Sequence, residues 1–518
     1  MYFNLAFAAL IWLCLMLHVL TDSVPCSVRD FGNGGIVCVC NSSYCDTVEP
    51  NGRLSPGNIA QYVTSANQTL NQTFVHFNNK AKANIVFSVN RNIVYQTITG
   101  FGGAFTDAAG INILSLTGNA RKYLLKSYYS PDGIEYTVGR IPMASCDFST
   151  HPYSYDDTPM DFNLTHFSLA PEDLKYKIPI IQRAKALSQR SISIFGSPWS
   201  APAWMKTNKN MTGKGRLIGE PGGKYYKTWA NYFVRFLQEY GKHNITLWGL
   251  TAQNEPTDGE LDNFPFQCMG WTPELQRDFI AMDLGPALHS SGYADVSLMM
   301  LDDQRILLSE WTDTVFSNPD NQKYVSGIGV HWYWDFLTPA VILDKTHAAF
   351  PSKFILATEA CQGSQPWQLK KVILGSWDRA ESYAHSIIED INHWVTGWTD
   401  WNIALDMRGG PNWVNNFVDS PVIVNAKAGE FYKQPMFYAM GHFSKYVVPG
   451  SKRIELKLTG DNKNLHSVAF LLPDDSIVVT VLNKDPGSIP VTVEDKNLGS
   501  FTTVLDGRSI TTWIWWFK

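Results

Sequence analysis

Two glutamates stand where the carboxylates of a hydrolytic pair are expected. Glu255 follows the apolar run 247–252 in the stretch TAQNEP (251–256), and Glu359 follows the run 354–358 in LATE. Two carboxyl groups about 5–5.5 Å apart, flanking a glycosidic bond, can act as acid/base and nucleophile with retention of configuration. At that distance the like charges resist joint ionisation, so one group keeps its proton while the other attacks. The pair predicts glycoside hydrolysis.

The residue before Glu255 strengthens this interpretation. A lone glutamate at a strand end is ordinarily a surface or salt-bridged residue. Asn254, however, precedes Glu255 directly, and an asparagine amide can hydrogen-bond a sugar 2-hydroxyl in a contact that strengthens in the transition state. The second glutamate, at another strand end, adds to the same hypothesis.

Further strand ends offer groups that can contact a sugar. Asp147 can accept hydrogen bonds from two adjacent hydroxyls, and Arg140 can pair with one of the catalytic acids. Aromatic faces stack on the C–H faces of sugars, although each aromatic taken alone also fits core packing. The other candidates at strand ends are Trp199, His331, Trp332, Tyr333, Trp401 and Asn402.

Other chemistries find little support. The chain has no H-E-x-x-H, no G-x-S-x-G and no G-x4-G-K-[ST] sequence. Cys361 lies two residues after Glu359, but no base positioned to activate it is evident. We expect neither a metal nor a cofactor.

The elements that must position these residues alternate between apolar runs and amphipathic stretches. A helical pattern such as Tyr225–Tyr240 has apolar residues at spacings of three and four. Eight alternations over about 300 residues predict a (β/α)8 barrel. A doubly wound sheet would also alternate, but residues 100–105 lack its G-x-G-x-x-G sequence. The predicted barrel strands are 93–101, 136–142, 192–199, 247–252, 296–301, 327–332, 354–358 and 395–401.

Strand patterns frame this block on both sides. After residue 450, short alternating strands at 467–472, 476–482, 491–493 and 511–516 are separated by turns, which predicts a β-sandwich. Residues 52–94 have similar character. The predicted division is 1–23 signal peptide; 24–51 with 403–435 small disulfide-containing sheet; 52–94 with 451–518 sandwich; and 95–402 with 436–450 barrel.

Composition excludes some partners. The chain has 518 residues, 45% of them hydrophobic, with a formal net charge of −5, so nucleic acid is not expected as a partner. Aromatic residues make up 13% of the chain, which suits either a large aromatic core or carbohydrate binding.

The N-terminus predicts secretion. The apolar run 5–20 is shorter than the roughly 20 residues that span a bilayer, and small residues follow it, so 1–23 is interpreted as a signal peptide, with a retained anchor as the alternative.

Four cysteines lie within twenty residues after this segment: Cys26, Cys38, Cys40 and Cys45. They predict two disulfides, for which the spacing allows three connectivities. A zinc site is the alternative. Cys146, Cys268 and Cys361 are expected to be free thiols. Six sequons predict a glycoprotein: Asn41, Asn67, Asn71, Asn163, Asn210 and Asn244.

Long blocks of the sequence resemble the glucosylceramidases of glycoside hydrolase family 30. The blocks include VCVCNSSYCD (37–46), GFGGAFTDAA (100–109), RIPMASCDFS (140–149), SPWSAPAWMKTN (197–208), NEP (254–256), FPFQCMGWTPE (264–274), MMLDDQR (299–305), VHWY (330–333), GWTDWNIAL (397–405) and GGPNWVNNFVDSP (409–421). They run from residue 26 to about 445.

The resemblance implies retaining hydrolysis of glucosylceramide to glucose and ceramide, with Glu255 as acid/base and Glu359 as nucleophile. It implies glucose contacts from Asp147, Trp199, Asn254, Trp401 and Asn416, and the pairing Cys26–Cys38 with Cys40–Cys45. It also implies a lysosomal enzyme that works on membranes with a saposin-type activator and anionic lipid.

The chain departs from the pattern at two positions. Gln253 replaces the glutamate of Thr-Ala-Glu-Asn-Glu-Pro, which removes a carboxylate expected near the acid/base. Phe264 replaces a tyrosine, which removes a hydroxyl expected at the rim of the site. These changes bear on the pH profile and the aglycone preference. Other β-glycosides, such as xylosides or β-1,6-glucan, and a catalytically inactive glycolipid-binding protein remain as alternative functions.

Overall fold

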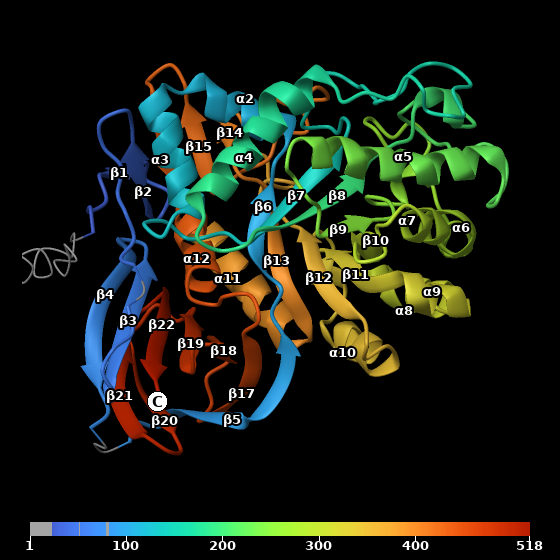
Figure 1. The fold of residues 1–518 in the computed structure, drawn as a ribbon. Coiled ribbons are helices and arrows are strands. Elements are labelled where there is room, and N and C mark those ends of the chain that lie inside the picture. Colours follow the sequence, from blue (N-terminus) through green and yellow to red (C-terminus); the bar gives the residue numbers. More distant parts are fainter. Residues whose placement is uncertain (1–22, 51, 79–81, 518) are drawn as a thin grey trace, which may run out of the picture.

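Eight parallel strands close into a barrel (Figure 1). The structure is a computed structural model that describes residues 23–50, 52–78 and 82–517; the predicted signal peptide 1–23, apart from Ser23, lies outside them. In barrel order the strands are β6 (Gly100–Ala104), β7 (Val138–Met143), β8 (Ser193–Pro198), β9 (Gly249–Thr251), β10 (Ser297–Gln304), β11 (Val325–His331), β12 (Phe354–Glu359) and β13 (Val395–Asn402). This confirms the predicted (β/α)8 class.

Helices follow the barrel strands and lie outside them (Figure 1). The longest, α5, buries an aromatic face that includes Trp229, Phe233, Phe236 and Tyr240, which confirms the helix predicted from spacings of three and four. The described helices are α2 (Asp107–Ser115), α3 (Gly118–Tyr129), α4 (Ile178–Leu187), α5 (Lys224–Lys242), α6 (Pro273–Phe279), α7 (Gly285–Ser290), α8 (Leu308–Val315), α9 (Pro319–Tyr324), α10 (Val341–Ala349), α11 (Trp377–Asn392) and α12 (Pro435–Ser444).

The prediction that residues 93–101 form the first barrel strand is wrong. Most of it belongs to β5 (Ile85–Thr97), which pairs outside the barrel, and the barrel strand begins only at Gly100. The strand β6 is glycine-rich because it packs tightly against β7: a Cβ at Gly102 would lie 1.8 Å from the Val138 carbonyl oxygen. Glycine has low strand propensity, so the sequence pattern favoured the neighbouring β-branched residues.

A nine-stranded sheet forms the second part of the molecule, at the lower left of Figure 1. Its order is β21–β20–β5–β17–β18–β19–β22–β3–β4, and it encloses a core that includes Ile59, Phe87, Ile477, Val491 and Trp513. The sequence missed β17 and β21. The bounds are β3 (Asn58–Ser65), β4 (Gln68–His76), β17 (Lys452–Thr459), β18 (Leu465–Leu471), β19 (Ser476–Asn483), β20 (Ile489–Asp495), β21 (Gly499–Leu505) and β22 (Ser509–Trp516).

The helix α12 connects the barrel to this sheet and is buried along its whole length. Its His442 lies between two threonines of the sheet, with each ring nitrogen 2.8 Å from a hydroxyl oxygen, of Thr512 and Thr64. Burial lowers the pKa of His442 to about 3, so its ring is neutral.

A five-stranded sheet joins the N-terminal segment to residues 405–433. Its order is β1 (Val28–Asp30), β2 (Ile36–Cys40), β16 (Glu430–Lys433), β15 (Val422–Asn425) and β14 (Leu405–Asp406). The disulfides beside it are Cys26–Cys38 and Cys40–Cys45, the pairing that the resemblance implied. Cys146, Cys268 and Cys361 are free and buried, as expected.

The predicted glycosylation sites differ in exposure. Five are exposed and Asn41 is half-buried; the exposed ones are Asn67, Asn71, Asn163, Asn210 and Asn244. Among the described residues, no helix combines the length and the apolar character that crossing a bilayer requires.

Candidate active site

A cavity of about 420 Å³ opens at the carboxyl ends of the barrel strands, where barrel enzymes place their functional groups. Seven of the residues proposed from the sequence line it: Asp147, Trp199, Glu255, Tyr333, Glu359, Trp401 and Asn416. Two others lie directly behind them, because Asn254 accepts a hydrogen bond from Arg140 and His331 contacts Glu255.

Glu359 ends β12 and is held by donors on both carboxyl oxygens. Arg140, buried on β7, donates from Nη1 to Oε2. The hydroxyl of Tyr333 donates to Oε1 over 2.5 Å. The carboxyl group is therefore fixed on a strand end by a cation and a phenol, with its orientation set for attack on a group in the cavity.

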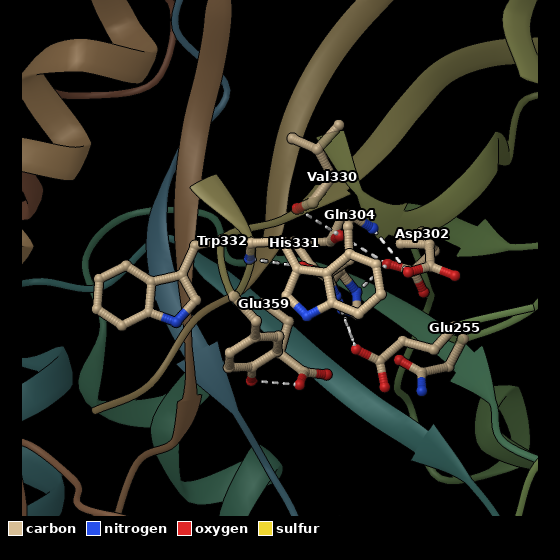
Figure 2. Close-up of polar contacts among 12 residues, drawn as sticks. Glu255, Asp302, Gln304, Val330, His331, Trp332 and Glu359 are labelled. Atoms are coloured by element: carbon tan, nitrogen blue, oxygen red, sulfur yellow. Dashed lines mark hydrogen bonds and ion pairs between the residues drawn. The ribbon is translucent and has the colours of Figure 1, made fainter. Parts of the chain in front are cut away.

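Glu255 lies on the connection after β9, opposite Glu359 (Figure 2). Its backbone has a φ of +39°, in the left-handed region that is unfavourable for a non-glycine residue. Its N–H donates to the Asp302 carbonyl over 2.9 Å, which holds this conformation. A carboxyl oxygen of Glu255 lies within 4.8 Å of one of Glu359, which fits the short separation of retaining enzymes better than the about 6.5–9.5 Å of inverting ones.

Asp302, at the end of β10, connects the two sides. It accepts from Arg140 Nη2 over 2.9 Å and Thr251 Oγ1 over 2.6 Å on one oxygen. On the other it lies 3.0 Å from His331 Nε2. Burial would raise the pKa of Asp302, but Arg140 and His331 hold it well below its usual range.

His331 lies between Glu255 and Asp302 (Figure 2). Its Nδ1 lies 3.1 Å from Glu255 Oε1. Burial alone would lower the pKa of His331, but Glu359, Asp302 and Glu255 raise it to about 10. The imidazolium therefore donates to Asp302 and Glu255 together.

The pKa values of the two glutamates are shifted in opposite directions. Burial raises the pKa of Glu359, and the charge of Glu255 adds to this, so Arg140 and His331 offset the increase only in part. At Glu255 burial is outweighed by the hydrogen bond and charge of His331, which lower the pKa. Because the two groups interact, their protons belong to the cluster rather than to either residue.

The remaining cavity wall can hold a sugar. Asp147 accepts from the side-chain amides of Asn412 and Asn416, each over 3.0 Å. Trp199 and Trp401 stack with ring centroids 5.2 Å apart. These aromatic faces and the carboxylate are the groups that sugar C–H and hydroxyl groups require.

The departure at position 253 leaves the polar contacts there complete. Gln253 donates to the carbonyls of Trp199 and Asn254 and accepts from Trp271 Nε1, over 2.8–3.2 Å. Phe264 lines the cavity and packs edge-on against Phe266, with ring centroids 4.5 Å apart.

Three acidic residues near Glu255 were missed. Asp302 and Asp303 lie beyond the predicted end of the fifth strand, where Leu301 and Asp302 have positive φ and the register shifts. Asp258 follows Glu255 on the same connection and hydrogen-bonds its carboxyl group. The pair of aspartates directly after an apolar run could have been recognised in the sequence, whereas no sequence pattern indicated Asp258.

Cys361, which was considered as a nucleophile on the basis of the sequence, is buried. Burial raises the pKa of its thiol well above the usual value.

A (β/α)8 barrel with facing glutamates after its fourth and seventh strands defines a retaining glycoside hydrolase. Residues 98–447 match the glycosyl hydrolase family 30 TIM-barrel domain, and residues 450–513 match the family 30 beta sandwich domain. The chain belongs to glycoside hydrolase family 30.

Relatives support this assignment over most of the chain. Lysosomal acid glucosylceramidase of Mus musculus is 50% identical over 494 residues, 95% of each chain. Putative glucosylceramidase 4 of Caenorhabditis elegans is 45% identical over 467 residues, 89% of each chain. The crystal structure of SrfJ from Salmonella typhimurium superposes with a TM-score of 0.81 at 27% identity, covering 89% of this chain and 100% of that one.

Proposed function

We propose that the protein hydrolyses glucosylceramide to glucose and ceramide with retention of configuration. The observation that carries the lipid part of this proposal is an exposed apolar rim at the mouth of the cavity. A soluble sugar needs no such surface, whereas a ceramide must leave a membrane and place its chains against apolar side chains.

The rim is formed by two loops, after β11 and after β12, and by the loop after Glu255. Its members are large apolar side chains, all about half exposed or more: Leu261, Trp334, Phe336, Leu337, Trp367 and Leu369. Phe336 and Trp367 pack edge-on, with ring centroids 5.5 Å apart. Leu261 and Trp334 also line the cavity, so the rim continues into the site.

The proposed reaction has two displacements. Glu359 attacks the anomeric carbon while Glu255 gives its proton to the glycosidic oxygen, so the C–O bond to ceramide breaks and a glucosyl ester forms on Glu359. Glu255 then takes a proton from water, whose oxygen attacks the anomeric carbon and releases Glu359 as carboxylate. Arg140 and Tyr333, both bonded to Glu359, stabilise the carboxylate that leaves.

In this proposal the glucose is held by Asp147, Asn254, Asn416, Trp199 and Trp401. Asp147 accepts from two hydroxyls, and the stacked tryptophans support the ring. We place the enzyme in the lysosome, peripherally on anionic membranes and with a saposin-type activator. Support comes from the glucosylceramidase relatives, from the predicted signal peptide and from the exposed rim, beside which the exposed Lys370 lies.

The first test is turnover at acidic pH of fluorogenic β-glucoside, β-xyloside and β-galactoside, followed by glucosylceramide in anionic liposomes. We expect the β-glucoside and the lipid to be cleaved and Glu359→Gln to lose at least about 10⁴-fold in kcat/KM, since covalent catalysis is removed. Faster cleavage of the xyloside, or of β-1,6-glucan assayed in parallel, would overturn the assigned substrate. Binding of glucosylceramide without any turnover would overturn the assignment as an enzyme and would favour a glycolipid-binding protein.

A second test locates the nucleophile directly. A 2-deoxy-2-fluoro-β-glucoside with a good leaving group should leave one sugar on the peptide that carries Glu359, detectable by mass spectrometry. The Glu255→Gln variant should still be labelled. A label on any other residue would contradict the assigned roles.

A further inference from the structure

A third carboxyl group contacts Glu255 and takes no part in the reaction described above. Asp258 follows Glu255 by three residues, at the start of a short 3-10 turn (Asp258–Glu260). Its carboxyl group is hydrogen-bonded to that of Glu255, and both side chains line the cavity. Two carboxyl groups can form such a bond only when they share a proton.

The position of Asp258 is fixed by its backbone. The Asp258 N–H donates to the Glu255 carbonyl over 3.0 Å. Thr257, between them, donates from N and Oγ1 to Asp303 Oδ2. Gly259 follows, where a Cβ would lie 1.9 Å from the Gly270 nitrogen, so the loop packs closely against residues 269–270. This backbone places the Asp258 carboxyl group beside that of Glu255.

The charges around Glu255 explain why a shared proton matters. Glu255 Oε1 already receives hydrogen bonds from Gln304 Nε2 and from the His331 imidazolium, each over 3.1 Å. Both donors favour the ionised form of Glu255, yet the first displacement needs Glu255 to carry a proton. A neutral acid in contact with Glu255 supplies that proton.

We infer that Asp258 is a positioning residue that holds the proton shared with Glu255 and delivers it when the leaving oxygen takes the proton of Glu255. This rests on the proposed function. In the first displacement the Asp258 O–H bond breaks as a Glu255 O–H bond forms, and Glu255 gives its proton to the aglycone oxygen. Asp258 is then a carboxylate. In the second displacement the proton taken from water by Glu255 returns to Asp258, so the cycle balances.

The surroundings agree with a neutral Asp258. Burial, Glu255 and Asp303 raise the pKa of Asp258 well above its usual value. Asp303 keeps both oxygens occupied by Thr257 and the Gln304 N–H, so it competes little for this proton. The titratable and charged groups that face the Asp258–Glu255 pair include Asp303, Cys268, His331, Arg140, Glu359, Asp147 and Tyr333. Glu260, further along the turn, is paired with Arg216.

Asp258 bears on the departure from the family pattern at Gln253. Gln253 contributes no carboxyl group to the cluster, since its amide is used by Trp199, Asn254 and Trp271. The carboxyl group beside Glu255 comes instead from Asp258, five residues further along the chain. The extra carboxyl group beside Glu255 is therefore at position 258 and not at position 253.

The test compares two leaving groups on one enzyme sample. Asp258→Asn and Asp258→Ala are assayed with 2,4-dinitrophenyl β-glucoside, whose leaving group needs no proton, and with an alkyl β-glucoside, whose leaving group does. We expect kcat/KM to fall about tenfold for the alkyl glucoside, within the ~10²–10⁴-fold that general acid catalysis supplies as a whole. The dinitrophenyl glucoside should be unaffected. The ratio of the two rates does not depend on how much enzyme is folded.

The pH profile gives an independent readout. Without Asp258 the proton is held by Glu255 alone, so the alkaline limb of kcat/KM for the alkyl glucoside should move to lower pH by about one unit or more. Asp262→Asn is the matched control, an exposed acid of the same loop that should change neither readout. Glu255→Gln should show the leaving-group pattern more strongly, and adding Asp258→Asn to it should have no further effect.

Two failures can be told apart. If the wild type cleaves both glucosides and Asp258→Asn changes the two rates equally, or changes neither, the inference on Asp258 is wrong and the proposed function stands. If the wild type cleaves no β-glucoside, the proposed function itself falls and the inference falls with it.

Discussion

Two buried histidines show that burial does not decide charge. His331 in the active site lies between Asp302 and Glu255 and is an imidazolium, with a pKa of about 10. His442, at the junction of α12 with the nine-stranded sheet, is equally buried but faces two threonine hydroxyls, and its pKa is about 3. The neighbours of each ring, and not its depth, set its state. The histidine at the end of the barrel is therefore charged and contacts the catalytic carboxyl group, whereas the histidine at the junction is neutral.

The largest effect should come from removing the counter-charge at the active site. Asp302→Asn leaves Arg140 and His331 buried without their shared carboxylate, so we expect a loss of about 3–5 kcal/mol in the free energy of unfolding. The pKa of His331 should fall at the same time. Urea unfolding and the pH titration of the His331 ring by NMR check this.

A matched pair at the surface provides the control for that variant. Asp344 lies 2.8 Å from His393, and both side chains are about one-third exposed. Asp344→Asn should cost less than about 1 kcal/mol. Equal losses at Asp302 and Asp344 would show that the buried carboxylate has no special role.

The second prediction concerns alkaline pH. Because the folded pKa of His331 is about 10 and an unfolded histidine titrates near ~6.5, its stabilisation is complete below pH ~6.5. It is lost between pH ~6.5 and 10, by about 1.4 kcal/mol per pH unit. In His331→Gln this slope should disappear, as measured by urea unfolding at several pH values. An unchanged slope would mean that the ring is neutral in the folded protein.

The third prediction has the opposite sign. His442 is neutral when folded, with a pKa of about 3, so its stabilisation is complete above pH ~6.5 and is lost as the pH falls toward 3. At pH ~5 the loss is about 2 kcal/mol. His442→Gln should lower stability near neutral pH but flatten its decline in acid. Parallel declines in variant and wild type would contradict this.

The sequence could predict what depends on local pattern. Glu255 and Glu359 each follow an apolar run within three residues, so the alternation of the barrel elements was enough to bring them to one end. Asp302 was missed because β10 continues past Leu301 through a register shift, which no alternation of residue types reveals. The bond between Asp258 and Glu255 was missed for another reason: it depends on how the loop packs against residues 269–270.

Contacts between residues far apart in the chain were also difficult to predict from the sequence pattern. The contacts of Arg140 could be expected, because a buried cation needs carboxylates. The glycine-rich β6 could not be placed, since its glycines serve the close approach of β7 and weaken the strand signal. Nor does any pattern show that β2 pairs with β16.

That pairing has a consequence for the timing of synthesis. Cys40 lies opposite Phe431, and the last strand, β22, sits inside the nine-stranded sheet between β19 and β3. A ribosome that adds about 5–20 residues per second needs roughly 20–80 s to travel from one partner to the other. Through that interval β2 and β3 can pair only with their chain neighbours β1 and β4, so the N-terminal thiols and the sequons at Asn67 and Asn71 stay open to oxidising and glycosylating enzymes. Residues 430–433 then complete the five-stranded sheet, and β22, the last strand of the chain, completes the nine-stranded sheet by pairing with β19 and β3. The closure of that larger sheet therefore waits for the C-terminus.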